Sequence, residues 1–464
     1  MIRSVTRPPQ VVGAIVLLLG VMATLGITAL AGTKTGVALA LAAVLGPLAG
    51  YGAICAPLVF PFTAYIALVP FDNLLALPAF GTLTRLLAIA CGGSIVLWLI
   101  RTRRFIPPDR ALVFWIALTA WAAASLGWAI DPNDSYAHLF TTLQLLGLYA
   151  AVSFVPIERR TLRVVLIAVV LSGAFAASYG VYVFRHGIDV NAGNGRLWLQ
   201  NDNSIVDPNQ FAAALLLPCA LALAGFLRAK SWTLWLGSSA ALVVMGLGIA
   251  VSGSRGAVLA LAAVLLYLVL RLRTGLLAAG VAVGALSCAL TFSSDLAQRF
   301  SIAASTDGAG RLDIWRVGLH AFRDYFWFGA GYSNFPLAYD QSFLTVSEHH
   351  YTWWHRAPHN ILLSTGVELG IVGLVLFLIA YAQQFRTLRV VGRQDPLFTV
   401  RVAVEGALIG LFVAGLFLDI LYTKYFWLAL MLAMLVRNAA YAPQRASSPY
   451  ARPVPTLLPS VDRR

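Results

Sequence analysis

The chain has 464 residues, of which 59% are hydrophobic and 11% charged, and its mean hydropathy is +0.80. Soluble domains have about 25% charged and 45–50% apolar residues, so this composition excludes a soluble enzyme, and the chain is also far too apolar to be disordered. The net charge is +14, which is typical either of a nucleic-acid-binding protein or of a membrane protein with basic cytoplasmic loops.

Fourteen apolar segments approach the roughly 20 residues that a membrane-spanning helix needs. Two of them, 36–53 and 54–70, have no charge between them and are interrupted by prolines, so they form either two spans or one span and a re-entrant piece. We therefore expect an all-α polytopic membrane protein with 12–14 transmembrane helices. The fourteen segments are 11–32, 36–53, 54–70, 84–100, 111–129, 135–155, 162–184, 209–229, 232–251, 256–272, 275–292, 360–385, 400–421 and 424–440.

The basic residues fix the orientation of these spans. If the N-terminus is cytoplasmic, 22 of the 33 Lys and Arg residues lie at the cytoplasmic side, many of them in short loops such as 101–110 and 271–274. This asymmetry predicts cytoplasmic N- and C-termini. It also explains the positive charge without any nucleic acid.

The chain divides into four regions. We expect N-terminal transmembrane helices over 1–292 with a short periplasmic loop at 185–208, a large periplasmic loop at 293–359, C-terminal transmembrane helices over 360–440 and a disordered cytoplasmic tail at 441–464. The first apolar run is longer than the roughly 7–15 residues of a signal-peptide core, so we take it as a retained span. All four cysteines fall in predicted spans and are interpreted as small buried residues.

The large loop contains most of the groups capable of proton transfer. Five of the seven histidines lie there, on the side of the membrane where ATP is absent. Apolar residues at spacings of three and four, from Leu312 to Phe326, predict an amphipathic helix over about 311–327. This helix either lies on the lipid headgroups or packs in a small periplasmic subdomain, and the two interpretations are compatible.

Two arginines at the periplasmic ends of predicted elements are candidates for anion binding. Arg255 lies in Val251-Ser-Gly-Ser-Arg-Gly256, a break between two apolar runs, and Arg311 lies in Gly310-Arg-Leu-Asp-Ile-Trp315. A single arginine at this depth often only extends its charge toward water. Flanking glycines allow close approach of the backbone, however, and the planar guanidinium matches the oxygens of a diphosphate.

His359 is the candidate base. In Ala357-Pro-His-Asn360, the proline keeps Ala357 out of helical geometry and so places His359 at the start of the next span. A neutral histidine can accept a proton from an attacking hydroxyl near pH 7. The alternative is that His359 only caps or anchors the helix.

Together these residues resemble the O-antigen ligase/polymerase superfamily. The resemblance is carried by His359-Asn360 followed after nine residues by Gly370-Ile-Val-Gly373, by Arg255-Gly-Ala-Val-Leu259, and by Gly310-Arg-Leu-Asp-Ile-Trp315 with Phe328-Gly-Ala-Gly-Tyr332; Asp207-Pro-Asn209 is a further similar feature. The motifs cover roughly 207–373 and favour the ligase (WaaL type). O-antigen polymerases and protein O-oligosaccharyltransferases share the layout.

The resemblance implies a metal-independent, inverting membrane glycosyltransferase with a GT-C-like fold and no cofactor. The donor would be undecaprenyl-diphosphate-linked O-antigen, the acceptor lipid A–core, and the product mature lipopolysaccharide. Arg255 and Arg311 would bind the diphosphate and His359 would activate the acceptor hydroxyl. Arg196 and Asn360 are weaker candidates for substrate binding.

Other functions remain open on the residues alone. Asn201-Asp-Asn203 with Asp207 offers oxygen ligands for calcium or simply forms turns, and His349-His350 with His355 offers nitrogen ligands for zinc. A transporter of polysaccharide-lipid is the rival class, but transporters bury ionisable residues mid-membrane. Here, apart from residues such as Glu368, Glu405 and Asp419, charges lie at span ends. An assembly protein would not need five histidines in one loop.

Overall fold

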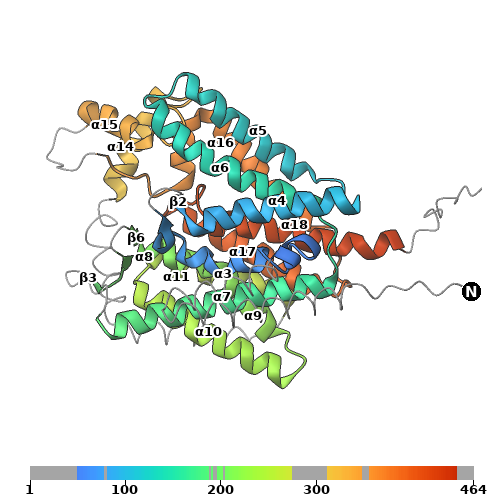
Figure 1. Cartoon of the computed structure of the whole chain (residues 1–464). Coiled ribbons are helices and arrows are strands. Elements are labelled where there is room, and N and C mark those ends of the chain that lie inside the picture. The colour runs from blue at the N-terminus through green and yellow to red at the C-terminus, as the bar shows by residue number, and fades with distance from the viewer. Residues whose placement is uncertain are drawn as a thin grey trace, which may run out of the picture.

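The protein is an all-α, multi-pass membrane protein (Figure 1). The computed structural model describes residues 50–77, 81–187, 190–191, 196–201, 204–273, 311–346 and 355–446. Within these ranges, nine helices are long and apolar enough to cross a membrane. The predicted spans 11–32 and 275–292 and most of 36–53 lie outside the described residues, so the total of 12–14 spans stays a prediction.

The nine helices follow the apolar segments predicted from the sequence. Side chains at several first turns explain where they begin, because Thr82, Asp109, Asp131, Ser231 and Ser254 each accept a hydrogen bond from a backbone N–H of the turn that follows. The nine are α4 Leu83–Thr102, α5 Arg110–Ala124 with the 3-10 turn η2 Ser125–Gly127, α6 Pro132–Phe154, α7 Arg159–Arg185, α8 Pro208–Ala214 continued by α9 Leu216–Leu227, α10 Trp232–Ser252, α11 Arg255–Leu272, α16 Ile361–Leu388 and α17 Phe398–Gly415.

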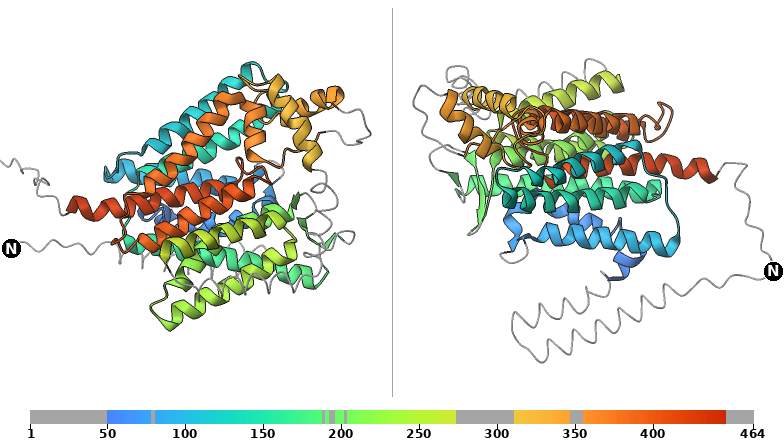
Figure 2. Two further views of the ribbon diagram at one scale, coloured as in Figure 1. Left: turned by 180° about the vertical axis from the view of Figure 1, so that it is seen from behind. Right: turned by 90° about the horizontal axis from the view of Figure 1, so that it is seen from above.

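Helix α18 (Lys424–Ala446) is enclosed by other helices over most of its length, and its C-terminal end projects from the bundle (Figures 1 and 2). Every residue from Phe426 to Ala440 is buried, and α18 packs against α6, α16, α17 and α7 (Figures 1 and 2). Its two buried cations have carboxylate partners, since Lys424 pairs with Asp72 and Arg437 with Asp109. Pairing of this kind is what makes charge tolerable inside a membrane protein.

The segment 54–70 does not form a continuous span. Helical residues end at Cys55, a turn containing Pro57 and Pro61 follows, and the chain resumes as α3 (Phe62–Leu68) and the 3-10 helix η1 (Val69–Leu75). Proline supplies no N–H to an intrahelical hydrogen bond, so the prolines interrupt the helix. The alternative of a second full span here is therefore wrong, and the piece from Phe62 to Asp72 is too short to cross.

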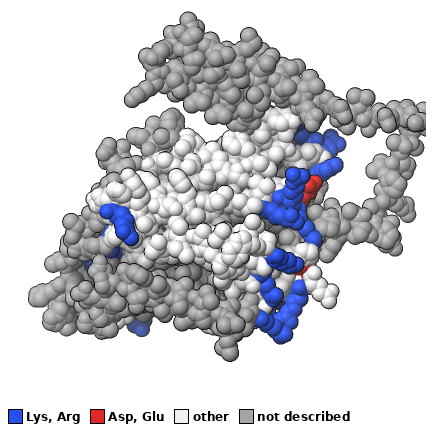
Figure 3. Space-filling model, turned by 90° about the horizontal axis from the view of Figure 1, so that it is seen from below, with Lys and Arg blue, Asp and Glu red and all other residues white. Residues whose placement is uncertain are grey.

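The bundle has two chemically different ends. Lys and Arg gather at one end (Figure 3), where α4 finishes with Arg101 and α5 begins at Arg110. We call this the basic end. The Thr387 hydroxyl near the end of α16 bonds to Asp109 there, whereas Trp121, late in α5, bonds to Leu369 in the first third of α16. Helix α16 therefore begins at the opposite end, which we call the site end.

Two short helices cover the site end. Helix α14 (Arg311–Asp324) and helix α15 (Phe335–Val346) pack on each other and on the start of α16 through Ile314, Val317 and Phe335. The predicted apolar stripe of α14 is only partly buried, because Trp315 and Phe322 pack against this cluster whereas Leu312 and Leu319 are exposed. The described part of the chain also contains three short antiparallel strand pairs: β1 Ala76–Leu77 with β2 Gly81–Thr82, β3 Val190–Asn191 with β4 Arg196–Leu197, and β5 Leu199–Asn201 with β6 Ser204–Val206.

Candidate functional site

The turn between α10 and α11 places Arg255 at the site end. Gly253 ends α10 in the left-handed conformation, with φ of 60°, which glycine adopts without strain. The Ser254 hydroxyl then accepts a hydrogen bond from the Ala257 amide and caps α11. Arg255 is consequently the first residue of α11, as expected from the Gly-Ser-Arg-Gly break in the sequence.

Phe417 connects the elements that carry the two arginines. It lies in the connection between α17 and α18, residues 416–423, and its ring centroid is 5.9 Å from the Arg311 guanidinium carbon. On its other side it packs against Gly256, where an added Cβ would lie 3.2 Å from the Phe417 Cβ. The absence of a side chain at Gly256 therefore lets this connection approach the start of α11.

The two guanidinium groups are close enough to influence each other. Burial and the positive charge of Arg255 lower the pKa of Arg311, and the nearby Asp207 carboxylate opposes this shift. Arginine nevertheless stays protonated in proteins. Two like charges held together in a partly buried site favour an anionic ligand, and a diphosphate offers oxygens to both.

His359 lies beside Arg311 at the start of α16. Its backbone has φ of 45°, and the preceding carbonyl of Pro358 accepts a hydrogen bond of 3.3 Å from the Trp315 indole of α14. Burial and the charges of Arg311 and Arg356 lower the pKa of His359, while Asp207 acts in the opposite direction. His359 is therefore neutral at pH 7, the form that can accept a proton.

Asn360 and Arg196 both make structural contacts. The Asn360 Oδ1 accepts from the Leu362 and Leu363 amides and caps α16. Arg196 donates to the Ser252 carbonyl at 2.9 Å and to Asn209 Oδ1 at 2.8 Å, so it joins the end of α10 to the start of α8. These contacts account for both residues without a substrate, and their predicted binding roles stay untested.

Asp207 caps α8 by accepting from the Asn209 and Gln210 amides. Two further members of the predicted calcium site, Asp202 and Asn203, lie outside the described residues, as do His349 and His350 of the predicted zinc site. His355 pairs with Asp340 at 3.0 Å. Among the described residues, no group of three or more His, Cys, Asp or Glu side chains is arranged to hold a metal ion.

Helix α16 is broken at Gly370, and the loop after α14 fills the break. Gly370 has φ of 67° and ψ of −170°, a conformation essentially restricted to glycine. The carbonyls of Val367 and Glu368 accept from the Ala330 and Gly331 amides, and the Ile371 amide donates to the Phe326 carbonyl. The spaced glycines of the sequence motif thus mark the place where the His359-bearing part of α16 is joined to the loop that follows Arg311's helix.

Sequence reasoning missed the residues that hold this site together. Phe417 and Trp121 act through single contacts between elements far apart in the chain, and no local pattern marks them. Trp315 belongs to a sequence motif, but its hydrogen bond to the Pro358 carbonyl was not predicted. In the sequence, Glu368 and Asp419 stand out only as charges inside predicted spans. Their position next to the break in α16 depends on the fold.

Fold and site together define a multi-pass membrane protein with a cationic site and a neutral imidazole at one end of its helix bundle. Residues 240–378 match a family model described as O-Antigen ligase (Wzy_C). This segment runs from α10 to the middle of α16 and includes Arg255, Arg311, His359 and Gly370. The match confirms the predicted resemblance to the O-antigen ligase superfamily, whose members are membrane enzymes of glycosyltransferase type. No curated protein matches the chain.

Proposed function

We propose that the protein is an O-antigen ligase. It transfers O-antigen polysaccharide from undecaprenyl diphosphate to lipid A–core and so completes lipopolysaccharide. The observation that carries the proposal is that the matched segment contributes Arg255, Arg311 and His359 from three different elements to one end of the bundle. Each of the three has the chemistry that such a transfer needs.

In the proposed reaction, the acceptor hydroxyl attacks the anomeric carbon of the donor sugar, and the bond from that carbon to the diphosphate oxygen breaks. His359 takes the hydroxyl proton. Arg255 and Arg311 stabilise the negative charge that develops on the departing diphosphate. A single displacement inverts the anomeric centre, and because the protein supplies two fixed cations, no metal ion is needed.

The distribution of charge supports a periplasmic site. The basic end corresponds to the cytoplasmic side by the positive-inside rule, and the site end lies opposite to it. With this orientation both chain termini are cytoplasmic, and the site faces the periplasmic side of a bacterial inner membrane. Lipid-linked donors are activated before they reach this side, so the reaction requires no nucleotide.

The test is ligation by the purified protein in liposomes with lipid-linked O-antigen and lipid A–core. We expect His359→Ala to abolish transfer while the control His320→Ala, an α14 histidine paired with Asp324, leaves it unchanged. Transfer by His359→Ala at the wild-type rate would remove His359 from catalysis. Loss on chelation that Mg²⁺ or Ca²⁺ restores would contradict the metal-free mechanism.

The product identifies the reaction within the superfamily. Sugar attached to lipid A–core indicates the ligase, whereas longer lipid-linked polymer indicates a polymerase and glycosylated protein indicates an O-oligosaccharyltransferase. Passage of intact lipid-linked sugar across the liposome membrane, with no new glycosidic bond, would instead assign the protein to the transporters.

A further inference from the structure

Two carboxyl groups contact the same hydroxyl, that of Ser364, beside the break in α16. Glu368, two residues before Gly370, is 3% exposed, and Asp419, in the α17–α18 connection, has a buried Oδ1. Among the described residues, neither forms an ion pair with Lys or Arg. Two neighbouring carboxylates in such surroundings would repel each other, and one of them is expected to be neutral.

The number of hydrogens available at the Ser364 hydroxyl also indicates that one of the two carboxyls is neutral. Ser364 Oγ lies 3.2 Å from Glu368 Oε1 and 3.0 Å from Asp419 Oδ2. A serine hydroxyl carries one hydrogen and an ionised carboxylate none. Both contacts are hydrogen bonds only if one of the two carboxyl groups donates a hydrogen to Ser364 while Ser364 donates to the other.

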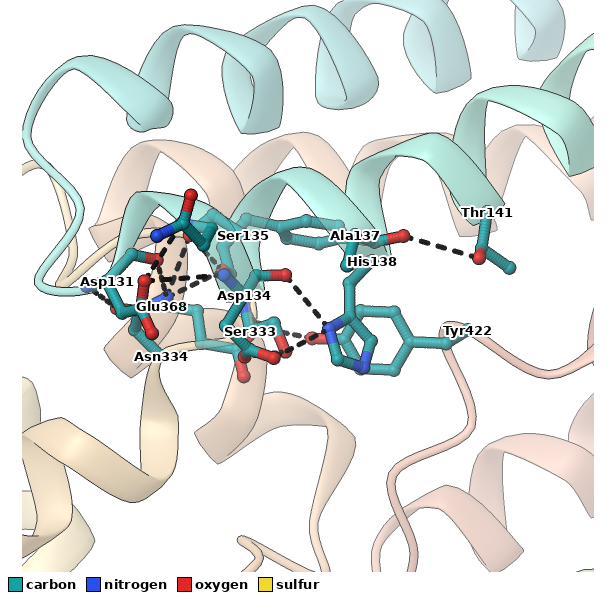
Figure 4. Close-up of polar contacts among 12 residues, drawn as sticks. Asp131, Asp134, Ser135, Ala137, His138, Thr141, Ser333, Asn334, Glu368 and Tyr422 are labelled. Carbon is teal, nitrogen blue, oxygen red and sulfur yellow. Dashed lines mark hydrogen bonds and ion pairs between the residues drawn. The ribbon is translucent and has the colours of Figure 1, made fainter. Parts of the chain in front are cut away.

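Glu368 also joins three segments of the candidate site. Its Oε2 accepts from the Ser333 amide at 2.9 Å and from the Tyr422 hydroxyl at 2.5 Å (Figure 4). Its backbone carbonyl accepts from the Gly331 amide. Ser333 and Gly331 belong to the loop after α14, and Tyr422 belongs to the α17–α18 connection. The loop after Arg311's helix, the His359-bearing part of α16 and the connection that carries Phe417 therefore meet at one side chain.

Other titratable groups lie around the two carboxyls. From α6, His138 is 43% exposed, lies 3.4 Å from Asp134 and faces the Tyr422 ring; Asp134 accepts a hydrogen bond from Ser333 Oγ. Tyr332 bonds to Thr142 and is buried. Burial raises the pKa of Asp419 to about 6, while the nearby His138 acts in the opposite direction.

We propose that Glu368 and Asp419 share one proton across Ser364 and that this pair is a positioning element of the site. The pair holds the α17–α18 connection, with Phe417 under Arg311, against the part of α16 that carries His359. The shared proton keeps the three segments together without an ion pair. The expected effect of the pair on ligation rests on the proposed ligase function. Its expected effect on protein stability does not.

The test compares an amide with a deletion at the same position. The Glu368→Gln amide supplies the hydrogen that the acid supplies to Ser364, and its oxygen still accepts from Ser333 and Tyr422. We expect this variant to keep the wild-type melting temperature and more than about half of the ligation rate, since no buried hydrogen bond is lost. Glu368→Ala is expected to have a lower melting temperature and a lower ligation rate, with a raised donor KM.

Glu405→Gln is the matched control. Glu405 is also a buried helical glutamate, but it pairs with Arg401 at 2.8 Å and Arg271 at 3.7 Å. Its amide leaves two cations without their counter-charge, so the melting temperature is expected to fall strongly. The two Glu→Gln changes therefore have opposite expected results at two similarly buried positions, which excludes a general tolerance of the bundle to this substitution.

A pH series gives an independent readout. The folded pair binds more protons than the same carboxyls do in the unfolded chain, so wild-type stability is expected to decline as the pH rises from about 4, the ordinary pKa of a carboxyl, through the raised pKa of about 6. Glu368→Gln cannot lose its amide hydrogens and should decline less.

Three results overturn the proposal: Glu368→Gln as unstable as Glu368→Ala, Glu368→Ala equal to wild type, or identical pH profiles for wild type and Glu368→Gln. If no form of the protein ligates, the proposed function fails, and the melting temperatures still decide whether the carboxyl pair shares a proton.

Discussion

Replacing Gly370 by alanine tests whether the break in α16 is required for the fold. The position has φ of 67° and ψ of −170°. An added Cβ would meet the backbone of the loop after α14, lying 2.7 Å from the Phe328 amide nitrogen. Backbone atoms of a loop that is hydrogen-bonded on both sides cannot move away as the end of a flexible side chain would.

The magnitude follows from two costs. Holding a residue with a side chain in this region of φ/ψ space costs about 1–3 kcal/mol. Moving the loop away breaks at least one of its hydrogen bonds to Val367, Glu368 or Ile371, at about 1 kcal/mol each. We therefore expect Gly370→Ala to lower the free energy of unfolding by roughly 2–5 kcal/mol. Ligation should fall as well, because the His359-bearing part of α16 shifts relative to Arg311.

The assay is thermal unfolding in detergent together with ligation in liposomes, compared with Gly147→Ala. Gly147 lies in α6, and a Cβ there meets nothing within 4 Å, so this control should be at least as stable as wild type, because alanine is the better helix former. A Gly370→Ala protein with the melting temperature and activity of the control would refute the conclusion that the loop fills the break through close backbone contact.

Three further predictions concern the site. Burial and Arg311 lower the pKa of His359 below its ordinary value of about 6.5. As the pH is lowered, kcat/KM for ligation should therefore stay constant through pH 7 and fall only in more acidic solution, where the base becomes protonated. A fall that already begins above pH 7 as the pH is lowered would contradict this. Phe417→Leu removes the ring under Arg311 and should raise the donor KM roughly two- to five-fold, from a cation–π contribution of about 0.5–1 kcal/mol, with an unchanged acceptor KM as the internal control. Trp121→Phe removes the 2.8 Å bond from its indole to the Leu369 carbonyl at the break and should destabilise the protein by about 1 kcal/mol, measured by thermal unfolding; no change in melting temperature would show that this bond contributes nothing.

Much of the fold was predictable because hydrophobic length is a local property. The helices α4 to α7, α10 and α11 lie where continuous apolar runs predicted them. The prediction was less reliable at 54–70, where apolar composition continues through the prolines that end the helix. The apolar stripe of α14 was also only part of the pattern, because α15 and the start of α16 bury Ile314 and Val317, whereas Leu312 and Leu319 stay exposed.

The candidate site was predictable as a set of residue types and not as an arrangement. Arg255 and His359 stand out because each follows a break in an apolar run. Phe417 has no such signal, because it lies at the end of an apolar segment like many other phenylalanines. Its position under Arg311 arises from contact between two elements more than a hundred residues apart.

By itself, then, the sequence determined that the chain spans a membrane many times, which end of the bundle is basic, and which arginines and histidine are available at the other end. Apolar length, loop charge and motif spacing are written along the chain, so these properties need no knowledge of packing. Only the tertiary structure decided that Gly370 opens α16 to the loop after α14, and that Glu368 and Asp419, fifty-one positions apart, meet across Ser364. Such contacts depend on which helices pack together, and hydropathy does not specify the partners of a helix.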